Sequence, residues 1–61
     1  LAPHDAEAWS MRGDVLLEIH RASEKEIHLT RAVEAWKKSL ALQPNQPKLQ
    51  KQVETYEAVL E

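Results

Sequence analysis

His20, Glu24 and His28 are the residues of this 61-residue chain whose types and spacing come nearest to a metal site. They recur every four residues, so on one continuous helix their side chains would share a face and could hold a cation. A metal site needs a full set of ligands in fixed geometry, and a turn near residues 22–23 would separate these three. We therefore interpret them as solvated polar residues and expect no metal and no other cofactor.

The hydroxyl groups of the chain lack the partners that a catalytic nucleophile needs. A serine or threonine is activated by a neighbouring base, and no paired histidine and aspartate accompany Ser10, Ser23, Thr30 and Ser39. Gly13 is the single glycine, so a glycine-rich phosphate loop cannot form, and without cysteine neither a disulfide framework nor a thiolate metal site is possible. We expect no catalytic residues and predict that the chain is not an enzyme.

Charge and hydropathy restrict the classes of partner. Ten acidic and eight basic side chains give a formal net charge of −2, whereas nucleic-acid binding favours a basic face. The longest aliphatic run, residues 15–17, is far shorter than the roughly 20 apolar residues of a membrane span, and no signal-peptide pattern is present. We expect neither a nucleic-acid nor a membrane partner. The compartment stays open, with the cytoplasm as our expectation.

Two amphipathic helices are predicted in the first two thirds of the chain. The first covers about residues 6–21, with Asp5 as its N-cap. Its apolar stripe comprises Trp9, Gly13, Leu16 and His20, flanked by Ala8, Val15 and Ile19. The second helix must end before Pro44, because the residue ahead of a proline is pushed out of the α region. Its stripe comprises Leu29, Val33, Trp36 and Leu40, flanked by Ala32 and Ser39.

A third helix follows the second after a short turn. Pro47 suits a first helical turn, where its missing N–H costs nothing. The stripe of this helix comprises Leu49, Val53, Tyr56 and Leu60, four, three and four residues apart. The sequence thus predicts an all-α fold, an antiparallel helical hairpin plus a third helix.

Small and large residues recur in this pattern at characteristic spacings: Trp9-x2-Arg12-Gly13-x2-Leu16, then Ala32-x3-Trp36, then Pro44. The pattern resembles the tetratricopeptide repeat, which reads W-x2-L-G-x2-Y, then A-x3-F, then P. Arg12 departs from the family, which has Leu there, so we expect that position to be partly exposed. Gly13 lets a partner helix pack closely, beside the small Ala32 and Ser39. We expect Ala at position 13 to be tolerated and Leu to clash near Ala32.

The resemblance implies a division of the chain as part of an α-solenoid of the right-handed superhelical type. Residues 6–46 would be one helix-turn-helix repeat, residues 1–5 the tail of a preceding repeat, and residues 47–61 a C-terminal capping helix. The outer side of that last helix is polar, with Gln50, Lys51, Glu54 and Glu57, as terminal repeats require.

Residues 6–46 exceed the family's repeat of about 34 residues by about seven, inserted around residues 21–27. Ser23 and Glu26 match a capping box, so we start the second helix at Glu24, giving helices at about 6–21 and 24–42, and expect Ile27 to fold onto the first helix. The alternative is a flexible loop, with the helix starting at Thr30.

The resemblance implies a non-catalytic protein–protein interaction module, whose first helices line a groove for a peptide or partner helix. The groove positions would be Glu7, Ser10, Asp14 and Leu17 on the first helix and Lys48, Lys51 and Thr55 on the third. Glu7 and Met11 occupy basic positions of the clamp with which some family members bind chaperone C-termini, so that motif is absent.

The identity of the protein or peptide partner is left open. The acidic residues of the first helix would also be explained by solvation alone. Two other functions remain: a self-association element, or an appendage of an enzyme whose catalytic part lies outside this sequence.

Overall fold

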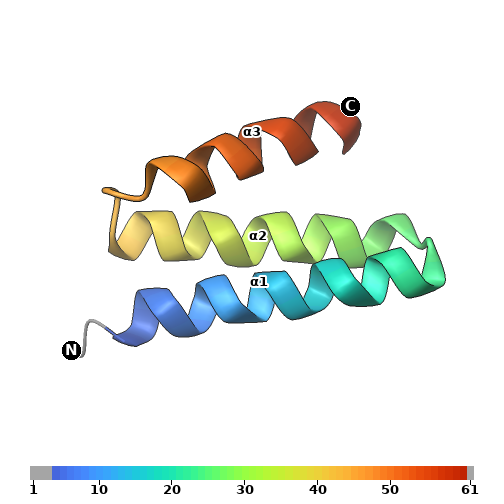
Figure 1. Ribbon diagram of the computed structural model, residues 1–61, viewed down its shortest axis with the longest axis horizontal. Coiled ribbons are helices and arrows are strands. Elements are labelled where there is room, and N and C mark those ends of the chain that lie inside the picture. The colour runs from blue at the N-terminus through green and yellow to red at the C-terminus, as the bar shows by residue number, and fades with distance from the viewer. Residues whose placement is uncertain (1–3, 61) are drawn as a thin grey trace.

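Three helices joined by two short links make up the computed structural model, which describes residues 4–60 (Figure 1). α1 spans His4–Ser23, α2 spans Glu26–Leu42 and α3 spans Pro47–Leu60. α1 and α2 form an antiparallel hairpin, and α3 runs back along α2, which lies between the other two helices in Figure 1. The predicted fold, an all-α hairpin plus a third helix, is confirmed.

Two of the helix ends agree with the sequence prediction, and the ends of α1 do not. α2 ends two residues before Pro44 and α3 begins at Pro47, as proline geometry requires. α1 is two residues longer at each end than expected, so Asp5 lies inside its first turn and is not its N-cap. Residues 4 and 5, assigned to the tail of a preceding repeat, belong to α1, whereas residues 1–3 lie outside the described part.

The link between α1 and α2 consists of Glu24 and Lys25. Glu24 has φ 57°, a left-handed conformation that usually takes glycine at the end of a helix and costs other residues about 1 kcal/mol. Its N–H donates to the carbonyl of His20 at 2.6 Å, which closes the last turn of α1. The chain therefore reverses within two residues.

Ser23 does not begin the second helix, and the predicted capping box is wrong. Its hydroxyl donates to the carbonyl of Ile19 at 2.9 Å, and its Oγ accepts a long bond from the N–H of Lys25. The N-cap of α2 is Lys25, with no capping side-chain bond. The predicted start at Glu24 is thus two residues early, because the left-handed Glu24 cannot belong to either helix.

The segment before Thr30 is helical, so the alternative of a loop up to that residue is wrong. Leu29 is buried in the core. Ile27 is 52% exposed, contrary to the expectation that it folds onto α1. Helix geometry explains the difference, since residues two apart point about 200° apart around the axis, and Leu29 takes the inward direction.

Trp36 lies at the centre of the core, with none of its surface exposed. Its ring faces Gly13 of α1 on one side and Tyr56 of α3 on the other, where the ring centroids are 5.6 Å apart and tilted by 40°. The buried core cluster spans all three helices: Leu17, Leu29, Ala32, Val33, Trp36, Leu49 and Val53. The predicted stripes of α2 and α3 are confirmed.

The predicted stripe of α1 is partly wrong. Val15 and Ile19 are exposed by 58% and 41%, whereas Leu17, which we had assigned to a binding groove, is buried. The core-facing line of α1 runs instead through Ala6, Gly13 and Leu17, at spacings of seven and four residues. Trp9 and Leu16 are half-buried beside this line.

Ser39 joins the ends of the helices through polar contacts. Its hydroxyl, fully buried, donates to the carbonyl of Ala6 at 2.6 Å, which fixes the start of α1 on α2. The side-chain amide of Gln46 donates to the carbonyl of Ser39 at 3.2 Å, to its Oγ at 3.1 Å and to the carbonyl of Gln43 at 2.7 Å. Gln46 thus adds a second donor to the carbonyl of Ser39, which already accepts the N–H of Gln43, and bonds the carbonyl of Gln43 just after α2 ends.

Gly13→Ala tests how closely α1 and α2 approach each other. In a helix interior this change normally stabilises by about 1 kcal/mol. Here the new Cβ would lie 2.9 Å from Cε2 of Trp36 and closer still to its Nε1 and Cδ1. Because the ring is fully buried in the core cluster, we expect a loss of about 1–3 kcal/mol in the free energy of unfolding, measured by urea denaturation. Two expectations are therefore revised. We no longer expect Ala to be tolerated at position 13, and a Leu there would meet Trp36 and not Ala32.

The variant Trp36→Phe supplies the matched background, because its smaller ring leaves room at position 13. The cost of Gly13→Ala should shrink in that background. A Gly13→Ala chain more stable than the parent would show that helix propensity outweighs the contact.

Amide hydrogen exchange tests the length of α2. We expect the amides of Thr30 and Arg31 to exchange almost as slowly as those of residues 33–40, because they lie inside a helix packed through Leu29. Amides of the first turn, such as that of Ile27, lack intrahelical acceptors and should exchange fast. Rapid exchange throughout residues 28–31 would instead indicate a loop.

Candidate partner-binding surfaces

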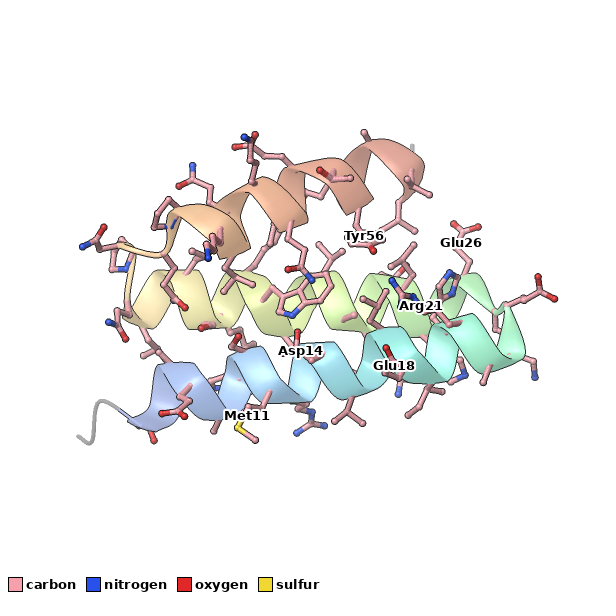
Figure 2. The ribbon with its side chains drawn as sticks, in the orientation of Figure 1. Met11, Asp14, Glu18, Arg21, Glu26 and Tyr56 are labelled. Carbon is pink, nitrogen blue, oxygen red and sulfur yellow. The ribbon has the colours of Figure 1, made fainter. Side chains whose placement is uncertain are left out.

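One face of the molecule carries most of the residues predicted for a binding groove, and we call it the α1/α3 face. Beneath it the buried Trp36 donates its indole N–H to Asp14 of α1, and its ring contacts that of Tyr56 of α3 at a tilt of 40°. Figure 2 shows the side chains of Asp14 and Tyr56 on opposite sides of the α2 ribbon. Glu7 and Ser10 precede Asp14 by seven and four residues, so they share its side of α1.

α3 contributes only part of its predicted set to this face. Lys48 and Thr55 are exposed and seven residues apart, on the flank of α3 away from Glu57, which pairs with Lys37 of α2. The hydroxyl of Thr55 donates to the carbonyl of Lys51 at 2.9 Å.

Two of the predicted groove residues do not fit this face. Lys51 is two residues from both Leu49 and Val53, the buried residues of α3, so it points away from α2. Leu17 is in the core and offers a partner no surface, so its assignment to the groove is wrong.

Asp14 both accepts a hydrogen bond from the core and carries a negative charge on this face. Its Oδ1 accepts the indole N–H of Trp36 at 3.3 Å, although the residue is exposed. Glu18, one turn further on, pairs with Arg21 at 3.5 Å and was missed by the sequence analysis. Glu7, Asp14 and Glu18 form an acidic line along α1 that faces solvent (Figure 2 labels the last two).

A second surface, not predicted from the sequence, is a groove of about 310 Å³ between α1 and α2, which we call the Trp9 groove. Its α1 side consists of Trp9, Arg12 and Leu16, and its α2 side of Arg31, Glu34, Ala35 and Lys38. Because Trp9 and Asp14 are five residues apart, they lie roughly 140° apart around α1. The groove therefore lies on a different side of α1 from the α1/α3 face.

Two cations lie over the exposed part of the Trp9 ring. Nζ of Lys38 is 4.8 Å and Cζ of Arg12 is 5.6 Å from the ring centroid, both within the range of a cation–π interaction. Arg12 is exposed, as its departure from the family pattern suggested. The sequence signal for this groove was Arg12, a basic residue at a position where the family has an apolar one. The residues of α2 that face Arg12 depend on how the two helices pair, and spacing along the sequence does not reveal them.

The seven signature positions of the resemblance occupy different environments. Gly13, Ala32, Trp36 and Ser39 are buried at the contact of α1 with α2, Trp9 and Leu16 are half-buried along the Trp9 groove, and Pro44 is exposed in the link before α3. The small positions thus lie buried where α1 and α2 contact each other.

Comparisons with known proteins found no matching family model, no matching curated protein and no matching solved structure.

The histidines do not gather into a metal site in the part of the chain that the structure describes. Glu24 breaks the helix between His20 and His28, and Nδ1 of His20 lies 2.9 Å from the carbonyl oxygen of Lys25. None of the three described helices is long and apolar enough to cross a bilayer.

Asp14→Ala tests the structural part of the role of Asp14. Losing the acceptor of the Trp36 indole should lower the free energy of unfolding by about 0.5–1.5 kcal/mol, whereas Asp14→Asn keeps an acceptor oxygen and should lose less. Thermal or urea denaturation measures both. Glu18→Ala, on the same exposed side of α1, is the control, and an equal loss there would mean that the bond to Trp36 contributes nothing.

Proposed function

We propose that this chain is a non-catalytic protein-binding module of the tetratricopeptide type, which binds a peptide or a helix of a partner protein on the α1/α3 face. The observation that carries the proposal is the opposite charge of the two flanks of this face. The carboxylates of Glu7, Asp14 and Glu18 line α1, the last of them paired with Arg21, and α3 presents Lys48 and, two turns further on, the hydroxyl-bearing Thr55.

The packing between the flanks supports the same function. The half-buried Tyr56 lies between the flanks and packs against the fully buried Trp36, so the face has an aromatic centre backed by the core. A bound segment would place basic groups along α1 and a carboxylate near Lys48, and complementary charge of this kind fixes the register and direction of a partner.

The proposal also rests on the resemblance, and Gly13 and Trp36, two of the positions that carry it, contact each other closely. In the repeat pattern a small residue on the first helix and a large aromatic residue on the second occupy these two places. α3 ends the unit with a solvated outer side: Gln50, Lys51 and Glu54 are exposed.

Peptide selection followed by nuclear magnetic resonance tests the proposal. Peptides enriched from a random display library on the 61-residue chain should shift the amide signals of Ser10, Asp14 and Thr55. Asp14→Asn and Lys48→Gln should each weaken binding about tenfold, because each removes one charge from the contact. Lys25→Gln, in the exposed link, is the matched control and should change nothing.

Two outcomes would contradict the proposal. One is a failure of the selection to enrich any peptide, or enriched peptides that shift amide signals of the protein only outside the α1/α3 face. The other is light scattering that rises with concentration in the absence of peptide and is abolished by substitutions on this face. That result would favour self-association, which the exposed Met11, Val15 and Ile19 of α1 would also serve.

A further inference from the structure

The Trp9 groove has an apolar floor of defined length. Trp9 and Leu16 are seven residues apart on α1, and Arg31 and Lys38 are seven apart on α2, so each wall is two helical turns, about 10 Å, long. Trp9 and Leu16 are half-buried, and Ala35 between the walls is buried. The floor is therefore accessible and contacts about two turns of a helix laid along it.

The walls of the groove are positive, although the chain as a whole carries a formal charge of −2. Arg12 lies on one wall and Arg31 and Lys38 on the other, against the single carboxylate of Glu34. Among the described side chains, none of these three cations has a carboxylate partner, in contrast to Arg21 and Lys37, which pair with Glu18 and Glu57.

The backbone around the groove selects the conformation of the occupant. Both walls are helices whose N–H and C=O groups are already bonded within the helix, so an extended segment would find no strand edge to pair with. A helical segment satisfies its own backbone and can lay an apolar face on Trp9, Leu16 and Ala35. One flank of this segment would contact Arg12. The other flank would contact Arg31, Glu34 and Lys38, whose charges alternate along α2: positive, negative, positive.

We propose that the Trp9 groove binds an acidic amphipathic helix of a partner protein, whose carboxylates replace the aromatic ring as the neighbours of Arg12 and Lys38. Carboxylates spaced by seven residues along the bound helix would reach Arg31 and Lys38, with a basic or neutral residue opposite Glu34. This surface is separate from the α1/α3 face, so this proposal and the proposed function can fail independently.

The test uses a stapled helical peptide of about four turns, with leucines at i, i+3, i+4 and i+7 and glutamates on both flanks. A peptide with lysines in place of the glutamates is its counterpart. The glutamate peptide should shift the indole N–H signal of Trp9, assigned through Trp9→Phe, and leave that of Trp36 nearly unchanged. The lysine peptide should bind at least about tenfold more weakly, and the affinity of the glutamate peptide should fall as salt is added.

Charge-matched variants locate the contact on the protein. Arg12→Gln combined with Lys38→Gln should weaken binding of the glutamate peptide at least about tenfold. The control, Arg21→Gln combined with Lys37→Gln, removes the same charge from the same two helices outside the groove and should change affinity less than about threefold. Circular dichroism of both double variants verifies that the helices remain, which is expected because all four side chains are exposed.

Several results would overturn the proposal. Equal binding of the two peptides, equal losses in the two double variants, or no binding of the glutamate peptide at about 1 mM would each do so. A Trp9 indole signal that moves with protein concentration, together with a dimer in light scattering, would show that a second copy of the chain occupies the groove instead.

Discussion

The indole of Trp36 fills the space that a side chain at position 13 would need, and the three helices are arranged around that contact. The same ring meets Tyr56 of α3 and donates its N–H to Asp14 of α1. A domain of about 60 residues buries only about 60% of the surface of its unfolded chain. One large side chain shared by three helices is therefore a substantial part of what holds this one together.

The polar contacts at the far end of the hairpin complement that apolar centre. Ser39 is small enough to let the start of α1 approach, and its hydroxyl bonds to the Ala6 carbonyl. Gln46 then closes the end of α2 and positions the backbone that begins α3, since its own carbonyl accepts the N–H of Gln50 at 2.9 Å. The link to α3 is thus held by one side chain, in place of the glycine that often ends a helix.

Sequence periodicity predicted α2 and α3 well, because each has one narrow apolar stripe and is bounded by a proline. It was only partly right on α1, where Gly13 is buried and Leu16 packs against the core as predicted, but the predicted flanking Val15 and Ile19 are exposed and Leu17 is buried. With Val15, Leu16, Leu17 and Ile19 so close together, spacing alone does not choose the inward face. Packing chose it, because only the line through Gly13 lets Trp36 enter.

The remaining misses have two physical causes. The Ser23 and Glu26 pattern is a genuine capping signature, but a left-handed Glu24 was needed to reverse the chain, and nothing in the residue type indicates it. The polar contacts of Gln46 and the groove around Trp9 depend on which residues of two different helices face each other. That pairing is a property of the folded hairpin and is not encoded in local spacing. Of the candidate sites, the sequence therefore supplied most of the α1/α3 face and, of the second groove, only the exposure of Arg12.

α3 packs on α2, and within the described residues the backbones of α1 and α3 do not come close to each other. The free energy of unfolding is then approximately a sum of contributions from each helix and from the two interfaces, α1 with α2 and α2 with α3. The hairpin and α3 are natural units of partial opening, so α3 can detach while α1 and α2 stay paired. Detachment would uncover Val33 and Trp36, which lie against Leu60 and Tyr56 of α3. Because α3 of another copy carries the same residues, this opening is also the route by which two chains could exchange their third helices.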